Sequence, residues 1–397
     1  MKYANTDDAM QLLSLVQSRL EVEPDDEEAK YWFIHAKYLI SQYENTIGSG
    51  LKYLTEVKNK TWLGRIHNRV GSAYYVLGDH ANASIHYKDA ETLFTQYGTP
   101  KDLASISNNM GLLSELAGDF DKALKYYQHS VDIVRIHGYK VLEALTLMNI
   151  GQIYYNMSEY ENALRINQEA EKLCRHVNNN FGICMALYRQ FLVYLELGDL
   201  ENAQSCADRH IELALNFPEV GIYQRVNELI QALLLKNTQT LEAKGKAIDQ
   251  LIAFCKYEGI DFRPKLVAMK ALIDLRIEEF RIFEKIEILA EIDNLIRDMD
   301  KLAHENKLYP LIVDIYILKA KMMQEKGDIA EARKQLLEGE RFVDNLGLEH
   351  LKININKEYL TLEENMKRMK DVIDKNLNMV KKVELDYLED YLKSIKL

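Results

Sequence analysis

Proline and glycine are scarce in this sequence, which has 5 and 18 of them among 397 residues. Tight turns depend on these two residue types, so their scarcity disfavours a sheet protein with many hairpin turns. No stretch of 18 or more uncharged apolar residues occurs, and the sequence therefore predicts no membrane span. The stretch Met1–Ala9 lacks the apolar core of a secretory signal.

Cysteine is also sparse, and no two cysteines form a CxxC pair. A disulfide framework usually has more cysteines in a smaller chain. We therefore interpret the cysteines as reduced core thiols in a reducing compartment, and we expect a cytoplasmic protein. The residues concerned are Cys174, Cys184, Cys206 and Cys255.

The chain has no excess of positive charge. Its 50 basic and 61 acidic residues give a net charge of −11. An acidic chain repels phosphate backbones at long range, so this balance disfavours a nucleic-acid partner. The apolar content of 47% is nevertheless enough for a packed core.

A repeat of 40 residues organises the middle of the sequence. A fixed period over several units is typical of repeat architectures. Three columns of residues recur at this step. They are Gly78-Asp79, Gly118-Asp119, Ser158-Glu159 and Gly198-Asp199; Ala83, Ala123, Ala163 and Ala203; and Gly71, Gly111 and Gly151, followed by Phe191.

Each unit is predicted to contain two helices. In the second unit, Leu103–Ala117 has apolar residues at helical spacing, and Asp121–His137 resumes the same periodicity. Gly118 and Gly138 fit helix ends, because glycine adopts the left-handed conformation at little cost. Asp119 stands where it can accept N–H bonds at the start of the second helix.

Glycine recurs in the middle of the first helix, where it costs up to about 1 kcal/mol relative to alanine. Its repeated use indicates that a neighbouring helix approaches closely there. We expect the small residues that face these glycines to be Ala83, Ala123 and Ala163.

This pattern resembles the tetratricopeptide repeat (TPR) in its longer form. The family's motif is a hydrophobic residue and Gly, a Tyr after two variable residues, then Gly-Asp, Ala, an aromatic and Ala. The first clear copy matches it as Val70-Gly71, Tyr74, Gly78-Asp79, Ala83, Tyr87 and Ala90. Later copies depart from it at Ser114, Ser130, Asn167, Phe191 and His210. The resemblance implies an all-α, superhelical solenoid of stacked antiparallel helix pairs.

The repeats become degenerate outside the clear copies, and we predict about eight hairpins plus a long C-terminal helix. The expected divisions are residues 1–60, an N-terminal capping helix and a degenerate hairpin; 61–217, four clear repeats; 218–308, two degenerate hairpins; 309–350, a last TPR-like repeat; and 351–397, a C-terminal capping or dimerisation helix.

The C-terminal segment from Asn354 to Leu397 contains neither Gly nor Pro. Its heptads are imperfect, which favours capping or a loose homodimer contact over a strict coiled coil. A linker helix leading to another domain is the remaining alternative. The apolar stripe consists of Met366, Met369, Ile373, Leu377, Val380 and Leu388.

Motifs for chemistry are missing from the sequence. It contains no Walker-type phosphate loop, no GxSxG and no HExxH. The histidines are scattered; His86 and His129 could meet across repeats, but they are more typical of solvated helix residues. We therefore predict a non-enzymatic protein with neither a metal site nor another cofactor.

The TPR resemblance implies that the first helix of each hairpin lines a concave groove, and that the residue two before the motif Gly points into it. Asn can donate to and accept from a peptide backbone at once, and Arg can hold a carboxylate through two parallel bonds. We therefore predict a peptide or protein segment as ligand, with acidic groups flanking a neutral middle. The positions are Arg69, Asn109, Asn149 and Arg189, to which helical spacing adds Arg65, Gln152 and Tyr155.

The same side chains also have a structural interpretation. Asparagines could bond to adjacent helices and fix their register, and Arg69 and Arg189 could pair with local carboxylates. We prefer the groove interpretation, because packing does not require a polar residue at this position beside the motif Gly in four consecutive repeats. Ser72 and Leu112 stand where the carboxylate-clamp subtype of the family places its first Asn, which disfavours chaperone C-terminal tails as ligands.

Three functions fit the sequence. The preferred one is a regulatory scaffold that binds a protein segment in its groove. The second is the sensory region of a bacterial signalling protein of cyclase or kinase type, which TPR arrays with a terminal helix resemble. The third is an intracellular receptor for a short signalling peptide, disfavoured because only Met1–Asp26 precedes the first hairpin, where such regulators usually carry an effector domain. An enzymatic role is a fourth interpretation, because solenoids occasionally carry sites on irregular repeats.

Overall fold

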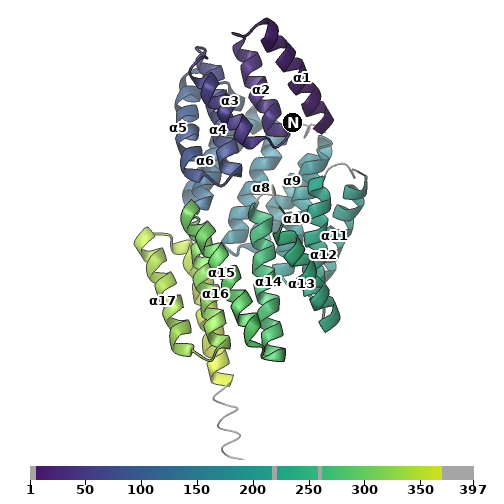
Figure 1. The fold of residues 1–397 in the computed structure, drawn as a ribbon, viewed down its shortest axis with the longest axis vertical. Helices are drawn as coiled ribbons and strands as arrows, with labels where there is room; N and C mark the ends of the chain where they lie inside the picture. Colours follow the sequence, from purple (N-terminus) through teal and green to yellow (C-terminus); the bar gives the residue numbers. More distant parts are fainter. Residues whose placement is uncertain (1–5, 217–220, 258–261, 369–397) are drawn as a thin grey trace, which may run out of the picture. The chain divides into compact units, whose positions relative to one another are not determined.

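The structure is a computed structural model, which describes residues 6–216, 221–257 and 262–368. All regular structure in these three ranges is helical, which confirms the predicted all-α class (Figure 1). The chain divides into two compact units, Met1–Ile312 and Val313–Leu397. Each unit is described separately.

The first unit begins with a single helix, and the helix pairs predicted from the repeat follow it. The first helix is α1 (Thr6–Val22), and the pairs are α2 (Glu27–Leu39) with α3 (Tyr43–Leu54), α4 (Lys60–Val76) with α5 (His80–Tyr97), α6 (Pro100–Leu116) with α7 (Phe120–His137), α8 (Lys140–Asn156) with α9 (Tyr160–His176), α10 (Asn180–Glu196) with α11 (Leu200–Leu215), α12 (Gly221–Lys236) with α13 (Leu241–Cys255), and α14 (Phe262–Phe283) with α15 (Ile286–Asn306). Helix α16 (Tyr309–Glu325) crosses the division between the units.

Glycine and aspartate form the turn inside the clear repeats, as predicted. Gly118 has a left-handed φ of 70°, and the Asp119 carboxylate accepts a bond from the backbone N–H of Lys122 at 3.1 Å. The third repeat has Ser158 at the glycine position with a φ of 60°, and Glu159 caps no backbone N–H. Left-handed backbone is unfavourable for a residue with a Cβ, so this turn carries strain that the glycine turns avoid.

The glycines in the first helices permit close contact with the second helices. A Cβ on Gly71 would lie 2.7 Å from the Tyr87 ring, and one on Gly111 would lie 2.5 Å from the Tyr127 ring. The predicted close approach is confirmed, but the motif tyrosine faces the glycine rather than the alanine expected from the sequence. Ala83 contributes only its backbone carbonyl, 3.3 Å from the Cβ position of Gly71. The ring occupies the space that a missing side chain leaves.

The fourth repeat exchanges the large and the small residue. Phe191 replaces the glycine on α10, and Ala207 on α11 stands where α5 and α7 have a tyrosine. Both side chains are fully buried in one hydrophobic cluster. The aromatic ring is thus supplied by the opposite helix, which accounts for the loss of the motif glycine.

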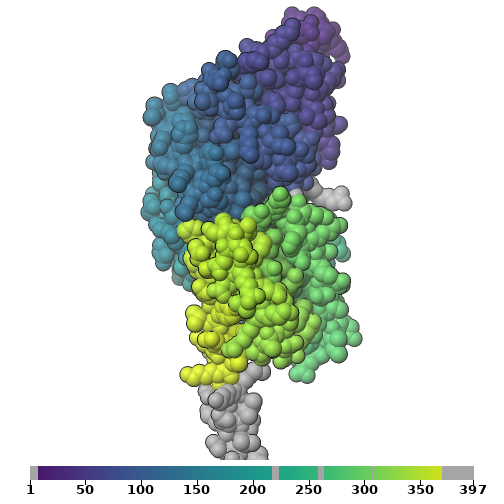
Figure 2. Space-filling view, turned by 90° about the vertical axis from the view of Figure 1, so that its left-hand side faces the viewer, coloured from purple at the N-terminus to yellow at the C-terminus, as the bar shows by residue number. Residues whose placement is uncertain are grey.

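Successive hairpins stack through their first helices. Helix α4 contacts α6, α6 contacts α8, and α8 contacts α10, while each of α5, α7 and α9 contacts the first helix that follows it. In Figure 2 the colours of this part pass gradually from purple to blue, because consecutive hairpins lie against each other. The first helices α4, α6, α8 and α10 therefore form a continuous layer.

Helix α14 contacts this layer although it is remote in sequence. Arg263, near its start, donates to the Tyr75 hydroxyl at 2.8 Å and lies 3.5 Å from the Glu115 carboxylate. Glu115 is only 5% exposed, and it also accepts a bond from the Tyr127 hydroxyl at 2.9 Å. The start of α14 is thereby joined to the ends of α4 and α6.

The second unit contains most of α16, α17 (Ile329–Leu346), a short 3₁₀ helix (Glu349–Leu351) and a helix over residues 352–368. A Cβ on Gly339 of α17 would lie 3.1 Å from Tyr316 of α16, so these two helices pack closely. Ile355 and Leu362 of the last helix are buried. Part of the predicted C-terminal helix is therefore present, whereas its apolar stripe from Met369 onward lies outside the described residues.

No helix in the described ranges is long and apolar enough to cross a bilayer. The cysteines are free thiols, as predicted, and Cys174, Cys184 and Cys206 are buried. Burial raises the pKa of Cys174 to about 11, so this thiol stays protonated and unreactive at neutral pH.

Candidate functional site

A row of hydrogen-bonded asparagines links the first helices of the clear repeats. Asn109 of α6 donates to Oδ1 of Asn68 on α4 at 2.7 Å. Asn149 of α8 donates to Oδ1 of Asn108 on α6 at 3.0 Å. Within α6, Asn108 donates to Oδ1 of Asn109 at 3.4 Å. We call these four residues the amide ladder.

The repeat length explains the ladder's geometry. Both bonds between helices join residues 41 positions apart. Since the repeat is 40 residues long, these partners differ by one position in their repeats. Sequence reasoning identified Asn109 and Asn149 but missed Asn68 and Asn108. The signal was present, because Asn68 and Asn108 themselves stand one repeat apart.

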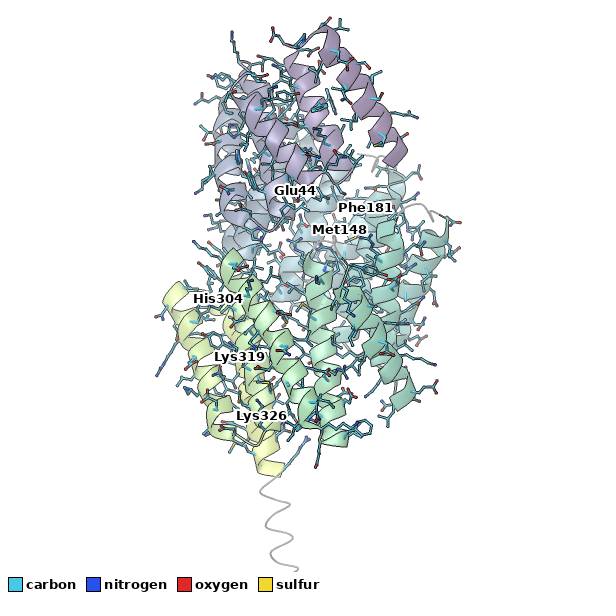
Figure 3. All side chains as sticks on the ribbon, in the orientation of Figure 1. Glu44, Met148, Phe181, His304, Lys319 and Lys326 are labelled. Atoms are coloured by element: carbon cyan, nitrogen blue, oxygen red, sulfur yellow. The ribbon has the colours of Figure 1, made fainter. Side chains whose placement is uncertain are left out.

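Arg189 extends the row of polar contacts to α10. Its Nη1 donates to the backbone carbonyl of Met148 on α8 at 2.5 Å, and the same nitrogen lies 3.4 Å from Oε1 of Gln152. Gln152 in turn donates to the Asn156 side chain at 2.9 Å. Figure 3 labels Met148 among the side chains of this region. Polar contacts thus join four consecutive first helices.

The ladder keeps hydrogen-bonding capacity that the described part of the chain does not use. Within the described ranges no group donates to Oδ1 of Asn149, and each ladder amide has a second N–H. The side chains of Asn109 and Asn149 are partly exposed. The asparagines therefore join adjacent helices and, within the described ranges, leave donors and one acceptor without a partner.

Arg65 binds a carboxylate of the protein itself. Its Nε and Nη2 donate to the two oxygens of Asp102 on α6, at 2.9 and 3.0 Å. Burial alone would raise the pKa of Asp102, but hydrogen bonds from Arg65 and Thr99 outweigh burial and hold that pKa below its usual value. The predicted clamp at this position is thus filled by a neighbouring hairpin.

Among the described residues, Arg69 has no comparable carboxylate partner. Its guanidinium carbon lies 4.5 Å from the centre of the Tyr38 ring on α2, and its buried Nε has no hydrogen-bond partner among the described residues. A guanidinium in this state can still bind an anionic group. The charge of Arg69 also acts on His35, which is 4% exposed and whose pKa is lowered to about 3, first by burial and then by Arg69 and Lys101.

Tyr155 lies beyond the ladder, toward the end of α8. Its hydroxyl bonds to the Glu196 carboxylate of α10 at 3.2 Å, and the Tyr160 hydroxyl bonds to the same group at 3.4 Å. Of the predicted groove residues, Gln152 and Arg189 form a polar contact between α8 and α10, whereas Asn109 and Asn149 belong to the amide ladder. Arg69 lies at the α4 end of the ladder, while Arg65 and Tyr155 are engaged by carboxylates of adjacent hairpins.

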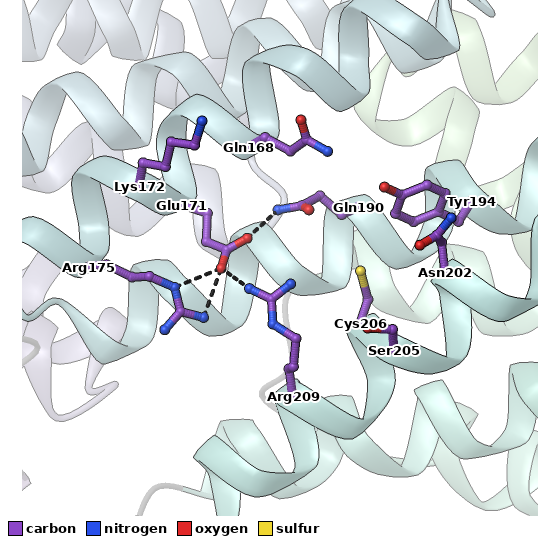
Figure 4. A pocket seen from close by; sticks show the side chains of 10 residues that line it. All are labelled: Gln168, Glu171, Lys172, Arg175, Gln190, Tyr194, Asn202, Ser205, Cys206 and Arg209. Carbon is purple, nitrogen blue, oxygen red and sulfur yellow. Dashed lines mark hydrogen bonds and ion pairs between the residues drawn. The ribbon is translucent and has the colours of Figure 1, made fainter.

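A pocket of about 250 Å³ lies between α9, α10 and α11 (Figure 4). The buried Glu171 carboxylate accepts bonds from Arg175 at 2.8 Å, from Gln190 at 2.8 Å and from Arg209. Cys206 also contributes to the wall. We interpret this network as structural, because the charged groups largely satisfy one another and connect three helices.

Residues 62–136 and 102–176 match a family model described as tetratricopeptide repeat. The chain contains TPR-type repeats over residues 62–176. None of the curated proteins shows a significant match to it.

Solved structures share the TPR protein's fold at low identity. A Rap protein complexed with competence and sporulation factor is 18% identical, over 72% of this chain and 81% of that one, with a TM-score of 0.56. The Rap conjugation gene regulator of plasmid pLS20, in complex with the Phr* peptide, is 12% identical over 85% and 96%, with a TM-score of 0.52. A human IFIT1 dimer with m7Gppp-AAAA is 13% identical over 85% and 68%, with a TM-score of 0.51. At these identities the likeness shows the fold alone.

Proposed function

We propose that this TPR protein is a non-catalytic regulatory scaffold that binds an extended peptide segment along the amide ladder. The observation that carries the proposal is the open acceptor of Asn149, at the end of a row of amides that is only partly used by the protein. Amide side chains can pair with a peptide backbone whatever its sequence. The four free cysteines favour a reducing, cytoplasmic location for this activity.

The spacing of the helices suits an extended chain. Packed helix axes are about 8–10 Å apart, and an extended peptide rises about 3.3 Å per residue. Every third residue of a peptide could therefore meet the next first helix. A segment of about nine residues would reach from α4 to α10, passing Asn109 and Asn149 on the way.

Charge defines one end of the ligand. Because Arg65 is bound to Asp102, Arg69 is the arginine with capacity for an external carboxylate at the α4 end. At the α10 end, Arg189 is bonded to a backbone carbonyl, which reduces its value as a clamp. We therefore expect an acidic group at the Arg69 end and a neutral remainder.

Proteins that share this fold were solved with ligands of different chemical classes, which supports ligand binding here but not one class of ligand. One was solved with competence and sporulation factor, one with the Phr* peptide and one with m7Gppp-AAAA. The net charge of −11 disfavours RNA here, whereas the amide ladder suits a peptide. A receptor for a short signalling peptide is a special case of this proposal.

The test compares capture of partners by three versions of the full chain. The ladder variant carries Arg69→Ala and Asn149→Ala. The matched control carries Lys125→Ala and Gln128→Ala, which remove one charge and one amide from exposed positions on α7. A peptide or protein held by wild type and control but lost from the ladder variant would support the proposal. Equal capture by all three, with equal melting temperatures, would contradict it.

Dimerisation through residues 351–397 is a separate proposal from the sequence. Light scattering of the full chain and of a chain ending at residue 350 would test it. The full chain should be a dimer and the shorter one a monomer. The same number of chains per particle in both would contradict this proposal.

A further inference from the structure

Two histidines and an aspartate come together in the α4–α5 hairpin. The Nδ1 atoms of His67 on α4 and His86 on α5 are 3.0 Å apart, and Oδ2 of Asp89 lies 3.5 Å from Nδ1 of His67. Ligand atoms from all three residues lie within 4.8 Å of one another. His86 therefore meets a histidine of its own hairpin; His129 instead lies 2.9 Å from the Ser107 hydroxyl.

We propose that His67, His86 and Asp89 bind a zinc ion. Zinc holds imidazole nitrogen and carboxylate oxygen at about 2.0–2.2 Å in tetrahedral geometry, which places neighbouring ligand atoms about 3.3 Å apart. The separations of 3.0 and 3.5 Å lie on either side of this value. Three protein ligands leave the fourth position for water.

The surroundings orient the three ligands. His86 and Asp89 are three residues apart on α5, so both side chains lie on one face of the helix. The Tyr74 ring stacks on the His86 ring, with centroids 5.6 Å apart and an angle of 16°. The side chain of Asp89 is 53% exposed and that of His67 is 15% exposed, so an ion can enter from solvent on the Asp89 side.

A hydrogen bond between the two imidazoles is the competing explanation. One proton between the Nδ1 atoms of His67 and His86 would account for their contact. The Asp89 carboxylate oxygen lies 3.5 Å from the same nitrogen, which is long for an acceptor sharing that N–H but fits a second ligand of one cation. A cation would engage all three groups at once, since their ligand atoms lie within 4.8 Å of one another.

Calorimetric titration of the metal-free full chain with Zn²⁺ at pH 7 tests the site. Wild type should bind one ion in a saturable step. Asp89→Asn, at an exposed position that folding tolerates, and His86→Gln should each weaken binding at least tenfold. His129→Gln, which removes a histidine from the next repeat, is the matched control and should bind as wild type does.

Titration with Co²⁺ supplies a readout of geometry, since a tetrahedral site gives visible absorption that water-coordinated cobalt lacks. Zn²⁺ should also raise the melting temperature of wild type and of His129→Gln, but not that of His86→Gln, because binding stabilises the folded state. No saturable binding by wild type would overturn the proposal. So would binding that is equal in His86→Gln and in the control.

Discussion

Arg263 donates a hydrogen bond to the hydroxyl of Tyr75, although 188 residues separate them. In an ideal solenoid each repeat contacts only its neighbours. Here the guanidinium at the start of α14 reaches the ends of α4 and α6, where it also approaches the buried Glu115 carboxylate. This arginine thus connects the degenerate repeats directly to the clear ones.

We expect Arg263→Met to lower the free energy of unfolding by about 1–3 kcal/mol, because it leaves the buried Glu115 carboxylate without its cation. Urea unfolding would measure the change. Arg297→Met is the matched control; it removes a mostly exposed pair with Asp293 and should change stability by less than about 1 kcal/mol. Equal effects of both substitutions would contradict the proposed connection.

Substitutions at two positions of the amide ladder should affect folding stability and ligand affinity to different degrees. Asn109→Ala removes bonds to both Asn68 and Asn108 and should cost about 1–2 kcal/mol of folding stability. Asn149→Ala removes one bond and the open acceptor, so it should cost less stability but more ligand affinity. Thermal unfolding and partner binding, measured on both variants, check this order. The reverse order would mean that Asn149 is purely structural.

The Glu171 network should stabilise the packing of the third repeat against the fourth. Glu171→Gln leaves Arg175 and Arg209 close together without their shared anion. We expect a loss of about 1–2 kcal/mol, moderated because both arginines are half exposed. Glu169→Gln, at an exposed carboxylate paired with Arg135, should have little effect. The difference between the variants should shrink in high salt, as measured by denaturant unfolding.

His35 should make folding sensitive to acid. Its folded pKa of about 3 lies below the ordinary value of 6.5. Between these two pH values His35 is protonated in the unfolded chain but not in the folded chain. The free energy of unfolding therefore falls as the pH drops from 6.5 toward 3. The loss at pH 5 should be about 2 kcal/mol from this residue. His35→Gln should show a correspondingly smaller difference between pH 7 and pH 5 in thermal unfolding; an unchanged difference would refute this origin.

Local sequence determines much of this structure, because each hairpin is specified within one repeat. Gly118 and Asp119 predict a turn through their own conformational preferences. Pairings between repeats are harder to foresee. Sequence reasoning did not anticipate that Arg65 would bind Asp102, since the register of one hairpin on the next must be known first. The contact of Arg263 with Tyr75 depends on rotation accumulated over many helices, which no local pattern records.

The histidine cluster shows a different limit. His67 and His86 stand on two helices and are 19 residues apart, which matches no metal-binding motif. Their proximity depends on the short distance between α4 and α5, which Gly71 permits because it has no side chain. The packing of a small residue thus places two ligands together that sequence spacing keeps apart.

The exchange between Phe191 and Ala207 bears on how such an array can be rearranged by gene recombination. A crossover at a boundary between hairpins would move each ring together with the space made for it. A crossover inside the turn would join α10 to a second helix of the α7 type, with two rings in one space, or α6 to α11, with a cavity. The unit that evolution can copy or shuffle in this chain is therefore the whole hairpin, never the single helix.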